Sequence, residues 1–207
     1  MYNCFIFDLD GVLVDTAFIQ SSSLICAIEK IAHVTLKNIQ DIEVAESGVS
    51  SIDKLIHFAN EGYFSQDLID NIYSEKKKIA DQQMLSLNPH DSLDKLEALR
   101  YLRGRNKIIS IVTNANKSST IKLLEHIKIL PLVHILVTNN DVAHTKPHSE
   151  PYFRAMLESG CDFEKFIIFE DSEVGLKSAR GTGVRTVEIA NATIINRDFI
   201  SGFVEEC

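Results

Sequence analysis

The chain has 207 residues, with no tryptophan, only four prolines and only four cysteines. Cys4, Cys26, Cys161 and Cys207 are far apart and form no C-x-x-C pair, which argues against a zinc site or a disulfide framework and favours reduced thiols. No apolar run reaches the roughly 18 residues that a membrane-spanning helix needs. The start, MYNCFIFDLD, lacks the basic and apolar stretches of a signal peptide. We therefore expect a cytoplasmic protein without membrane association.

Positive charge is also scarce, because 21 Lys and Arg residues face 29 Asp and Glu residues and the formal net charge is -8. This balance argues against general nucleic-acid binding, which needs a basic face. A local basic pocket stays compatible with it, and a net-acidic protein that uses an anionic substrate must concentrate its few cations and a metal at one site. An apolar content of 45% is ordinary for a globular protein. Nothing in the pattern indicates assembly, so a monomer is the default expectation.

Proline is absent from residues 17–83, since all four prolines lie from Pro89 onward. This segment has no convincing strand and shows helical patterns at residues 17–32, 52–60 and 66–82. We interpret residues 17–83 as a helical insertion in a discontinuous core formed by residues 1–16 and 84–207.

The core segments alternate between two kinds of pattern. Short apolar runs typical of buried strands occur at residues 4–9, 107–113, 134–138, 166–170 and 185–189. Helical patterns lie between them at residues 92–102, 118–127, 151–157 and 173–180. Strands that alternate with helices and are apolar on both faces predict an α/β fold, a Rossmann-like parallel sheet flanked by helices.

The first strand ends in two acids, Asp8 and Asp10, followed by Gly11. Residues two apart on a strand end can point to the same side, and two close carboxylates repel unless a cation lies between them. Mg²⁺ prefers such carboxylate oxygens. The alternative is an ordinary strand end followed by a turn, which an isolated D-x-D does not exclude.

Other polar residues also follow predicted strands. Thr113 and Asn114 end the second one, Lys146 follows the third, and the adjacent acids Glu170 and Asp171 end the fourth. Taken singly, these residues have plainer explanations as helix caps or a solvated loop lysine. Ligands of open α/β sheets bind at the carboxyl ends of strands, and the set supplies acids, a hydroxyl and a cation. Phosphoryl transfer needs this inventory, because positioning and charge neutralisation do most of its work.

The order of these motifs resembles that of the haloacid dehalogenase superfamily. The motifs are FDLDGVLVDT at residues 7–16, then Thr113, then Lys146-Pro147, then FEDSEVGLKSA at residues 169–179. The likeness is greatest to the subfamily of phosphatases and beta-phosphoglucomutases with a helical cap. It implies that Asp8 is the nucleophile and Asp10 the general acid/base, and that Thr113 and Lys146 hold the phosphate and the nucleophile. The implied Mg²⁺ ligands are Asp8, Asp10 through its backbone carbonyl, Asp171 and, in support, Glu170. Asn114 is a further candidate for substrate binding.

The same resemblance makes residues 17–83 a helical cap, and the segment around Gly48, Ser50 and Ser51 its specificity loop. Mutases of the subfamily usually have an Arg where this chain has Ser51, and a His where it has Gln20. Both departures favour a Mg²⁺-dependent phosphatase that hydrolyses a small phosphorylated metabolite through an aspartyl-phosphate. A beta-phosphoglucomutase-like sugar phosphate mutase is the alternative, and a non-catalytic regulatory protein on the same scaffold is a third. The presence of Asp10 and of the Glu170-Asp171 pair argues against a dehalogenase.

Overall fold

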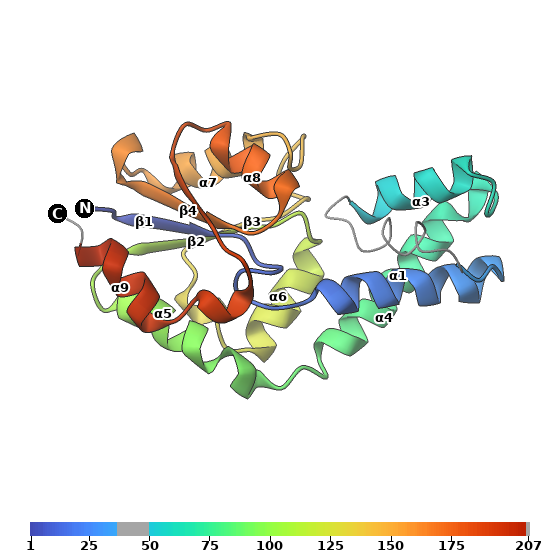
Figure 1. Cartoon of the computed structure of the whole chain (residues 1–207), viewed down its shortest axis with the longest axis horizontal. Helices are drawn as coiled ribbons and strands as arrows, with labels where there is room; N and C mark the ends of the chain where they lie inside the picture. Colours follow the sequence, from blue (N-terminus) through green and yellow to red (C-terminus); the bar gives the residue numbers. More distant parts are fainter. Residues whose placement is uncertain (37–49, 206–207) are drawn as a thin grey trace. The chain divides into compact units, whose positions relative to one another are not determined.

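The computed structural model describes residues 1–36 and 50–205. Two compact units make up the chain: Met1–Asp15 together with Asn88–Cys207, and Thr16–Leu87 (Figure 1). Gly48, which the sequence assigns to the cap loop, lies outside the described residues.

The first unit is built on a five-stranded sheet of β1 (Cys4–Phe7), β2 (Ile108–Val112), β3 (Ile135–Val137), β4 (Phe166–Glu170) and β5 (Arg185–Glu188). The strand order is β3-β2-β1-β4-β5, and all neighbours are parallel. The predicted parallel α/β fold is confirmed. The central strand β1 is the point at which the order reverses, because β2 lies on one side of it and β4 on the other.

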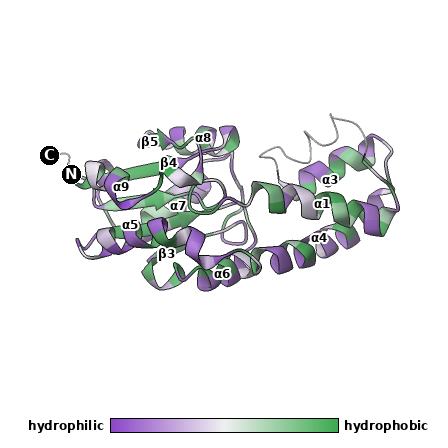
Figure 2. Ribbon diagram, turned by 60° about the horizontal axis from the view of Figure 1, so that its bottom comes forward, coloured by the Kyte–Doolittle hydropathy of each residue, from purple (hydrophilic) through white to green (hydrophobic). Residues whose placement is uncertain are grey.

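Helices cover both faces of this sheet (Figure 1). On one face lie α7 (Glu150–Ser159) and α8 (Glu173–Arg180), and on the other lie α5 (Leu93–Arg103), α6 (Lys117–His126) and α9 (Arg197–Glu205). Alternate residues of a strand point to opposite faces. Ile6 and Ile168 accordingly pack in the cluster with α7, whereas the rings of Phe7 and Phe169 stack 4.9 Å apart. Both faces are apolar, as Figure 2 shows for the green strands.

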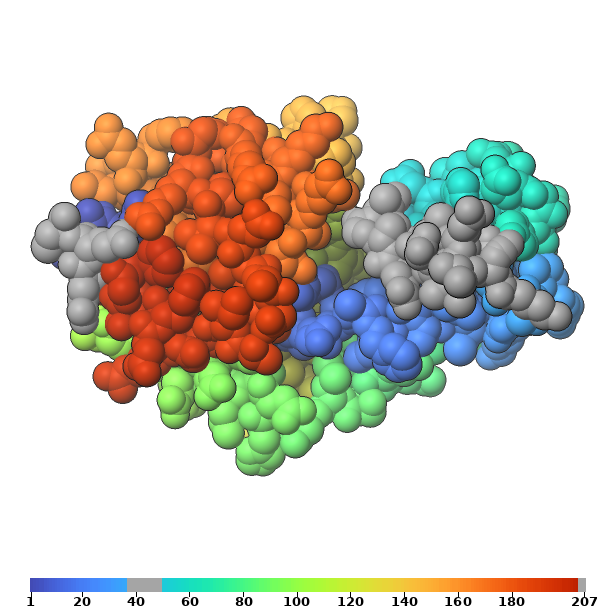
Figure 3. Space-filling model, in the orientation of Figure 1, coloured from blue at the N-terminus to red at the C-terminus, as the bar shows by residue number. Residues whose placement is uncertain are grey.

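Helix α9 is an element that the sequence patterns did not predict. Its Phe199 and Phe203 meet the ring of Phe169 edge-on, with centroids 6.2 and 5.3 Å away, and Ile200 and Val204 are buried. In Figure 3 the residues of α9, in red, and the α5 region, in green, lie side by side. The helix therefore closes the sheet face that carries Phe7 and Phe169.

The second unit is entirely helical in its described part, with α1 (Ala17–Ala32), α3 (Ser51–Asn60) and α4 (Ile69–Met84). Its own core consists of Leu24, Ala27, Ile28, Leu36, Leu55, Phe58, Phe64 and Ile72. Short 3-10 helices complete the two units at Gln66–Leu68, Pro89–Ser92, Leu130–Leu132, Phe163–Lys165 and Ala192–Ile194. Among the described residues, no helix combines the length and the apolar character needed to cross a membrane.

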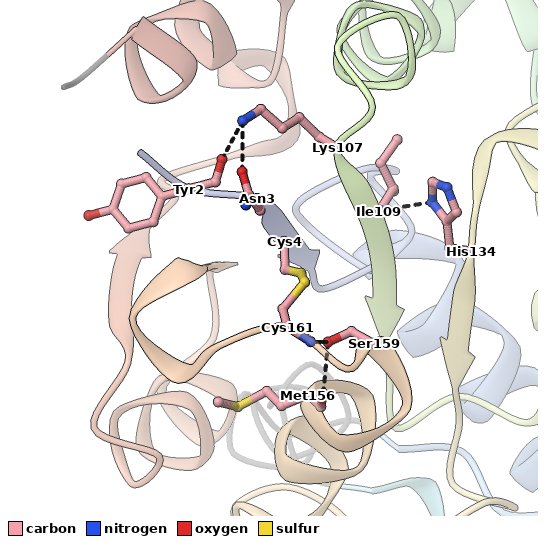
Figure 4. Close-up of a disulfide and its surroundings, with 9 residues drawn as sticks. All are labelled: Tyr2, Asn3, Cys4, Lys107, Ile109, His134, Met156, Ser159 and Cys161. Carbon is pink, nitrogen blue, oxygen red and sulfur yellow. Dashed lines mark hydrogen bonds between the residues drawn. A yellow bond between two sulfur atoms is a disulfide. The ribbon is translucent and has the colours of Figure 1, made fainter.

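A disulfide joins Cys4 on β1 to Cys161, which follows α7 (Figure 4). The expectation that all cysteines are reduced is therefore wrong for this pair. Their sequence separation of 157 residues hid their proximity, because the sequence does not reveal that α7 ends beside the start of β1. Cys26 is free and exposed, as expected.

Candidate active site

The carboxyl edge of the central strands collects the predicted polar residues. Phe7 pairs with Ile111 of β2 and with Phe169 of β4, so the chain leaves all three strands at the same edge. Asp8 follows directly, and its backbone N–H donates to the carbonyl of Phe169 at 2.9 Å. This is the switch point at which open α/β sheets form their sites.

Gly11 shapes the turn that follows Asp8. Its φ of 87° lies in the left-handed region that favours glycine. A Cβ at this position would lie 1.9 Å from Oδ2 of Asp171. Glycine here therefore allows the turn after β1 to approach the carboxylate that follows β4.

Lys146 is the buried cation of the site, and its side chain is only 4% exposed. Its Nζ donates to Oδ1 of Asp8 at 2.6 Å and to Oε1 of Glu170 at 2.5 Å. Burial alone lowers the pKa of this ammonium, but the carboxylates, Asp8 first, outweigh burial and leave the pKa well above its usual value. Lys146 therefore stays charged between two acids.

Two supports hold the backbone around Lys146. The Asn114 side chain accepts from the Lys146 N–H at 3.0 Å and donates to the Lys146 carbonyl at 3.1 Å. On the same loop, the Glu150 carboxylate accepts from the N–H groups of Ala143 at 2.7 Å and His144 at 3.0 Å. The loop that carries the lysine is thus tied both to the end of β2 and to the start of α7.

Glu170 is completely buried, and both of its oxygens are occupied. Oε1 accepts from Lys146 and from the Tyr152 hydroxyl at 3.0 Å. Oε2 accepts from the N–H groups of Asp171 at 2.9 Å and Ser172 at 3.1 Å. Burial raises the pKa of this carboxyl, but Lys146 and these hydrogen bonds leave the pKa below its usual value.

Asp8 and Asp171 differ from Glu170 in their electrostatics. Burial raises the pKa of Asp8 well above its usual value, and the charges of Glu170 and Asp10 raise the pKa further against the pull of Lys146. Burial, followed by the charge of Glu170, raises the pKa of Asp171 to about 6. Both groups thus lack enough positive charge nearby to stabilise their ionised forms.

A divalent cation would supply that charge. Asp8, Glu170 and Asp171 each offer a carboxylate oxygen, and these atoms lie within 4.8 Å of one another. Oδ1 of Asp171 is buried and has no hydrogen-bond partner in the part of the chain that the structure describes. A buried carboxylate oxygen without a donor is costly unless it meets a cation. The residues therefore fit a hard cation such as Mg²⁺.

The remaining predicted core residues lie at the same edge. The Thr113 hydroxyl, on a residue that is 2% exposed, donates to Oδ2 of Asp10 at 3.3 Å and accepts from the Ala115 N–H at 3.0 Å. The structure thus brings together Asp8, Asp10, Thr113, Asn114, Lys146, Glu170 and Asp171.

The predicted cap residues Ser50 and Ser51 belong to the other unit. Ser50 is the N-cap of α3, where its hydroxyl accepts from the Asp53 N–H at 3.2 Å and donates to Oδ2 of Asp53 at 2.6 Å. Ser51 opens the helix. Their assignment to substrate binding stays a prediction.

Tyr152 is a site residue that the sequence reasoning missed. It is completely buried on α7, with its hydroxyl on Glu170 and its ring 5.0 Å from Nζ of Lys146. The available signal was a tyrosine, rather than a phenylalanine, at a core position in the helix after Lys146-Pro147.

Comparisons with known proteins identify the family and several relatives of this chain. Residues 5–189 match the family description "Haloacid dehalogenase-like hydrolase". Pyrophosphatase PpaX of Bacillus pumilus is 25% identical over 195 residues, which cover 91% of this chain and 83% of that protein. A phosphorylated carbohydrates phosphatase of Thermotoga maritima is 24% identical over 187 residues, covering 88% and 82%.

The fold is also that of solved structures. A beta-phosphoglucomutase from Clostridium difficile superposes with a TM-score of 0.78 at 19% identity, covering 99% of each chain. The family match spans most of the chain, including most of β1, the Lys146 loop and the two acids at the end of β4. On this ground the chain is a member of the haloacid dehalogenase-like hydrolase family.

Proposed function

We propose that the protein is a Mg²⁺-dependent phosphatase that hydrolyses a small phosphorylated metabolite through an aspartyl-phosphate on Asp8. The observation that carries the proposal is the pairing of buried Asp8 with Lys146 at 2.6 Å, beside Oδ1 of Asp171, which has no hydrogen-bond partner among the described residues. The names of relatives that act on phosphorylated carbohydrates or pyrophosphate support the substrate class.

In the first step, a carboxylate oxygen of Asp8 attacks phosphorus while Asp10 protonates the leaving oxygen. In the second step, Asp10 takes a proton from a water, which attacks the phosphorus and frees the Asp8 carboxylate. Lys146 offsets the repulsion between the Asp8 carboxylate and the phosphate, and Thr113 contributes its hydroxyl. The Thr113 contact with Asp10 supports the placement of both side chains at one reaction centre.

Asp8 and Asp171 would hold the Mg²⁺ by their carboxylates, and Asp10 by its backbone carbonyl. When bound, the ion neutralises charge on the phosphate and the nucleophile. Glu170 was predicted as a supporting ligand. Because both of its oxygens are already occupied by donors, we assign it instead to holding Lys146 and the amides that follow β4.

We further propose that the helical unit acts as a cap. Ser51 stands where mutases of the resembled subfamily usually carry an Arg for a second phosphate, and Gln20 stands where they usually carry a His. Gln20 accepts a hydrogen bond from Lys76 within the helical unit. These residues favour hydrolysis over phosphoryl transfer to a second sugar position.

The test is phosphate release from a panel of sugar phosphates, phosphoglycolate, nucleotide monophosphates and pyrophosphate, with Mg²⁺ or with EDTA. We expect release that needs Mg²⁺ and falls at least roughly a thousandfold in Asp8→Asn. Asp94→Asn makes the same change at an exposed position on α5 and should leave the rate unchanged. No release from any ester by folded, Mg²⁺-bound protein would contradict the proposal. Conversion of one sugar phosphate isomer into another would identify a mutase instead.

A further inference from the structure

Tyr152 contacts both members of the Lys146–Glu170 ion pair. Its hydroxyl donates to Oε1 of Glu170 at 3.0 Å, the same oxygen that accepts from Lys146 at 2.5 Å. The centroid of its ring lies 5.0 Å from Nζ of Lys146. One side chain thus supplies a donor to the carboxylate and an aromatic face to the ammonium.

The core position of Tyr152 would accept an apolar ring. The residue is completely buried in a cluster with Ala155 and Met156 of α7 and with Ile6 and Ile168 of the sheet. Burying a hydroxyl there is unfavourable unless it forms a hydrogen bond, and Glu170 provides the acceptor. Core packing therefore explains why an aromatic ring stands at residue 152, and the hydrogen bond to Glu170 explains why the ring carries a hydroxyl.

The hydroxyl matters because Lys146 is shared by two carboxylates. Asp8 offers Oδ1 at 2.6 Å and Glu170 offers Oε1 at 2.5 Å, so the ammonium is held between them. A donor on Oε1 disperses part of the Glu170 charge. Without it, that charge would attract the ammonium more strongly and draw it away from Asp8.

We propose that Tyr152 is a positioning residue for the reaction: its hydroxyl, by donating to Glu170, keeps the Lys146 ammonium on Asp8. The proposal rests on the proposed function in so far as it concerns catalysis. Its structural content, the place of Lys146, stands independently of the substrate.

Tyr152→Phe removes the hydroxyl and keeps the ring. We expect kcat to fall roughly tenfold, the effect of about one hydrogen bond to a charged group, with KM changed less than about twofold. Tyr101→Phe is the matched control, since its ring contacts Arg105 and Arg197 and is buried in the same unit. A merely structural role would lower the melting temperature of Tyr152→Phe and leave the kcat of the folded enzyme unchanged.

Crystal structures of the wild-type protein and of Tyr152→Phe test the position of Lys146 directly, and they need no measurement of enzymatic activity. We expect the distance from Nζ of Lys146 to Oδ1 of Asp8 to rise from 2.6 Å to beyond about 3.5 Å in the variant. An unchanged distance would overturn the proposal, whatever the kinetics show. If the wild-type protein releases no phosphate, the proposed function fails, and this distance still tests the role of Tyr152.

Discussion

At the scale of single residues, the site concentrates negative charge in a small buried volume. Asp8, Glu170 and Asp171 place carboxylate oxygens within 4.8 Å of one another. Lys146 pairs with the first two, and Glu170 also accepts hydrogen bonds from Tyr152 and from backbone amides. Asp171 keeps a buried oxygen without a donor in the described part of the chain. The residue-scale account therefore assigns the Mg²⁺ to Asp171 and Asp8, and assigns Glu170 to holding Lys146 beside Asp8.

This assignment predicts a pH dependence of Mg²⁺ binding. The pKa of Asp171 is raised to about 6, so the metal-free carboxyl takes up a proton as the pH falls through that value. Mg²⁺ competes with the proton, and its affinity should fall by roughly threefold to tenfold between pH 7 and pH 5.5. Without metal, the raised pKa means that stability is lost as the pH rises from about 4 to 6, because the folded state binds more protons there.

Isothermal titration calorimetry with Mg²⁺ at several pH values, with Asp171→Asn as the control, measures this dependence. Affinity independent of pH over that range would contradict the assignment of Asp171. The variant should bind Mg²⁺ weakly at every pH.

Gly175 gives a second residue-scale prediction. Gly175 lies in the first turn of α8, and a Cβ on it would be 1.8 Å from Oε1 of Glu170. Gly175→Ala should therefore displace Glu170 and lower the free energy of unfolding by roughly 1–3 kcal/mol, with loss of activity. Gly202→Ala on α9 is the control, because, apart from its chain neighbours and the backbone of its own helix, no atom of residues 1–36 or 50–205 lies within 4 Å of its Cβ position. Alanine in a helix should keep or increase stability by up to about 1 kcal/mol. Equal effects of both substitutions in chemical denaturation would refute the explanation.

At the scale of elements, the site is assembled where three neighbouring strands end and where a loop before α7 supplies the cation. Asn114 follows β2 and connects that strand to the Lys146 loop by two hydrogen bonds to the Lys146 backbone. The sequence assigned Asn114 to substrate binding, whereas these bonds give its side chain a role in holding the loop.

We expect Asn114→Ala to lower kcat about tenfold and stability by roughly 1–2 kcal/mol, because two buried backbone groups of the loop lose their partners. Asn191→Ala is the control: it removes a side chain that accepts from the Thr193 N–H in the 3-10 helix Ala192–Ile194, and it should affect stability alone. Steady-state kinetics beside thermal melts separate the two effects. Full activity of Asn114→Ala would show that the Lys146 loop holds its shape unaided.

The element scale also shows what sequence reasoning can recover. The five strands were predicted because each is a short run rich in β-forming residues between helical patterns, although the edge strand β5 is only partly buried. Helix α9 was missed, since its apolar residues are interrupted by Ser201 and Gly202 and its packing partner Phe169 is distant in the sequence. The core site residues were predicted from the order of strand-end motifs. Tyr152 was not, because its partner Glu170 is 18 residues away and only the fold brings them together.

At the scale of the whole molecule, the chain consists of a sheet unit and a helical unit, each with its own core. The disulfide between Cys4 and Cys161 adds a covalent link within the sheet unit, close to the start of the strand that carries Asp8. The sequence separation of 157 residues concealed this disulfide from the sequence analysis. The same large separation increases the stability that the disulfide adds. Closing a long loop restricts the unfolded chain, by the chain-entropy account.

Reduction of this disulfide should therefore lower the free energy of unfolding by about 5 kcal/mol. For a chain of this size, that corresponds to a melting temperature lower by roughly 10–20 °C. Thermal melts with and without dithiothreitol measure the shift, and Cys161→Ser should melt like the reduced protein. Cys26→Ser, at the exposed free thiol, should melt like the oxidised wild type. An unchanged melting temperature on complete reduction would contradict the prediction.

The central claim is that Asp8 becomes phosphorylated. The most direct measurement is mass spectrometry of the acid-quenched enzyme after it has been mixed with a phosphate ester and Mg²⁺. The account predicts one added phosphoryl group on the peptide that contains Asp8, absent in Asp8→Asn and lost on treatment with base. Phosphate release at full rate with no phosphoryl group on that peptide, or with the group on another residue, would contradict it.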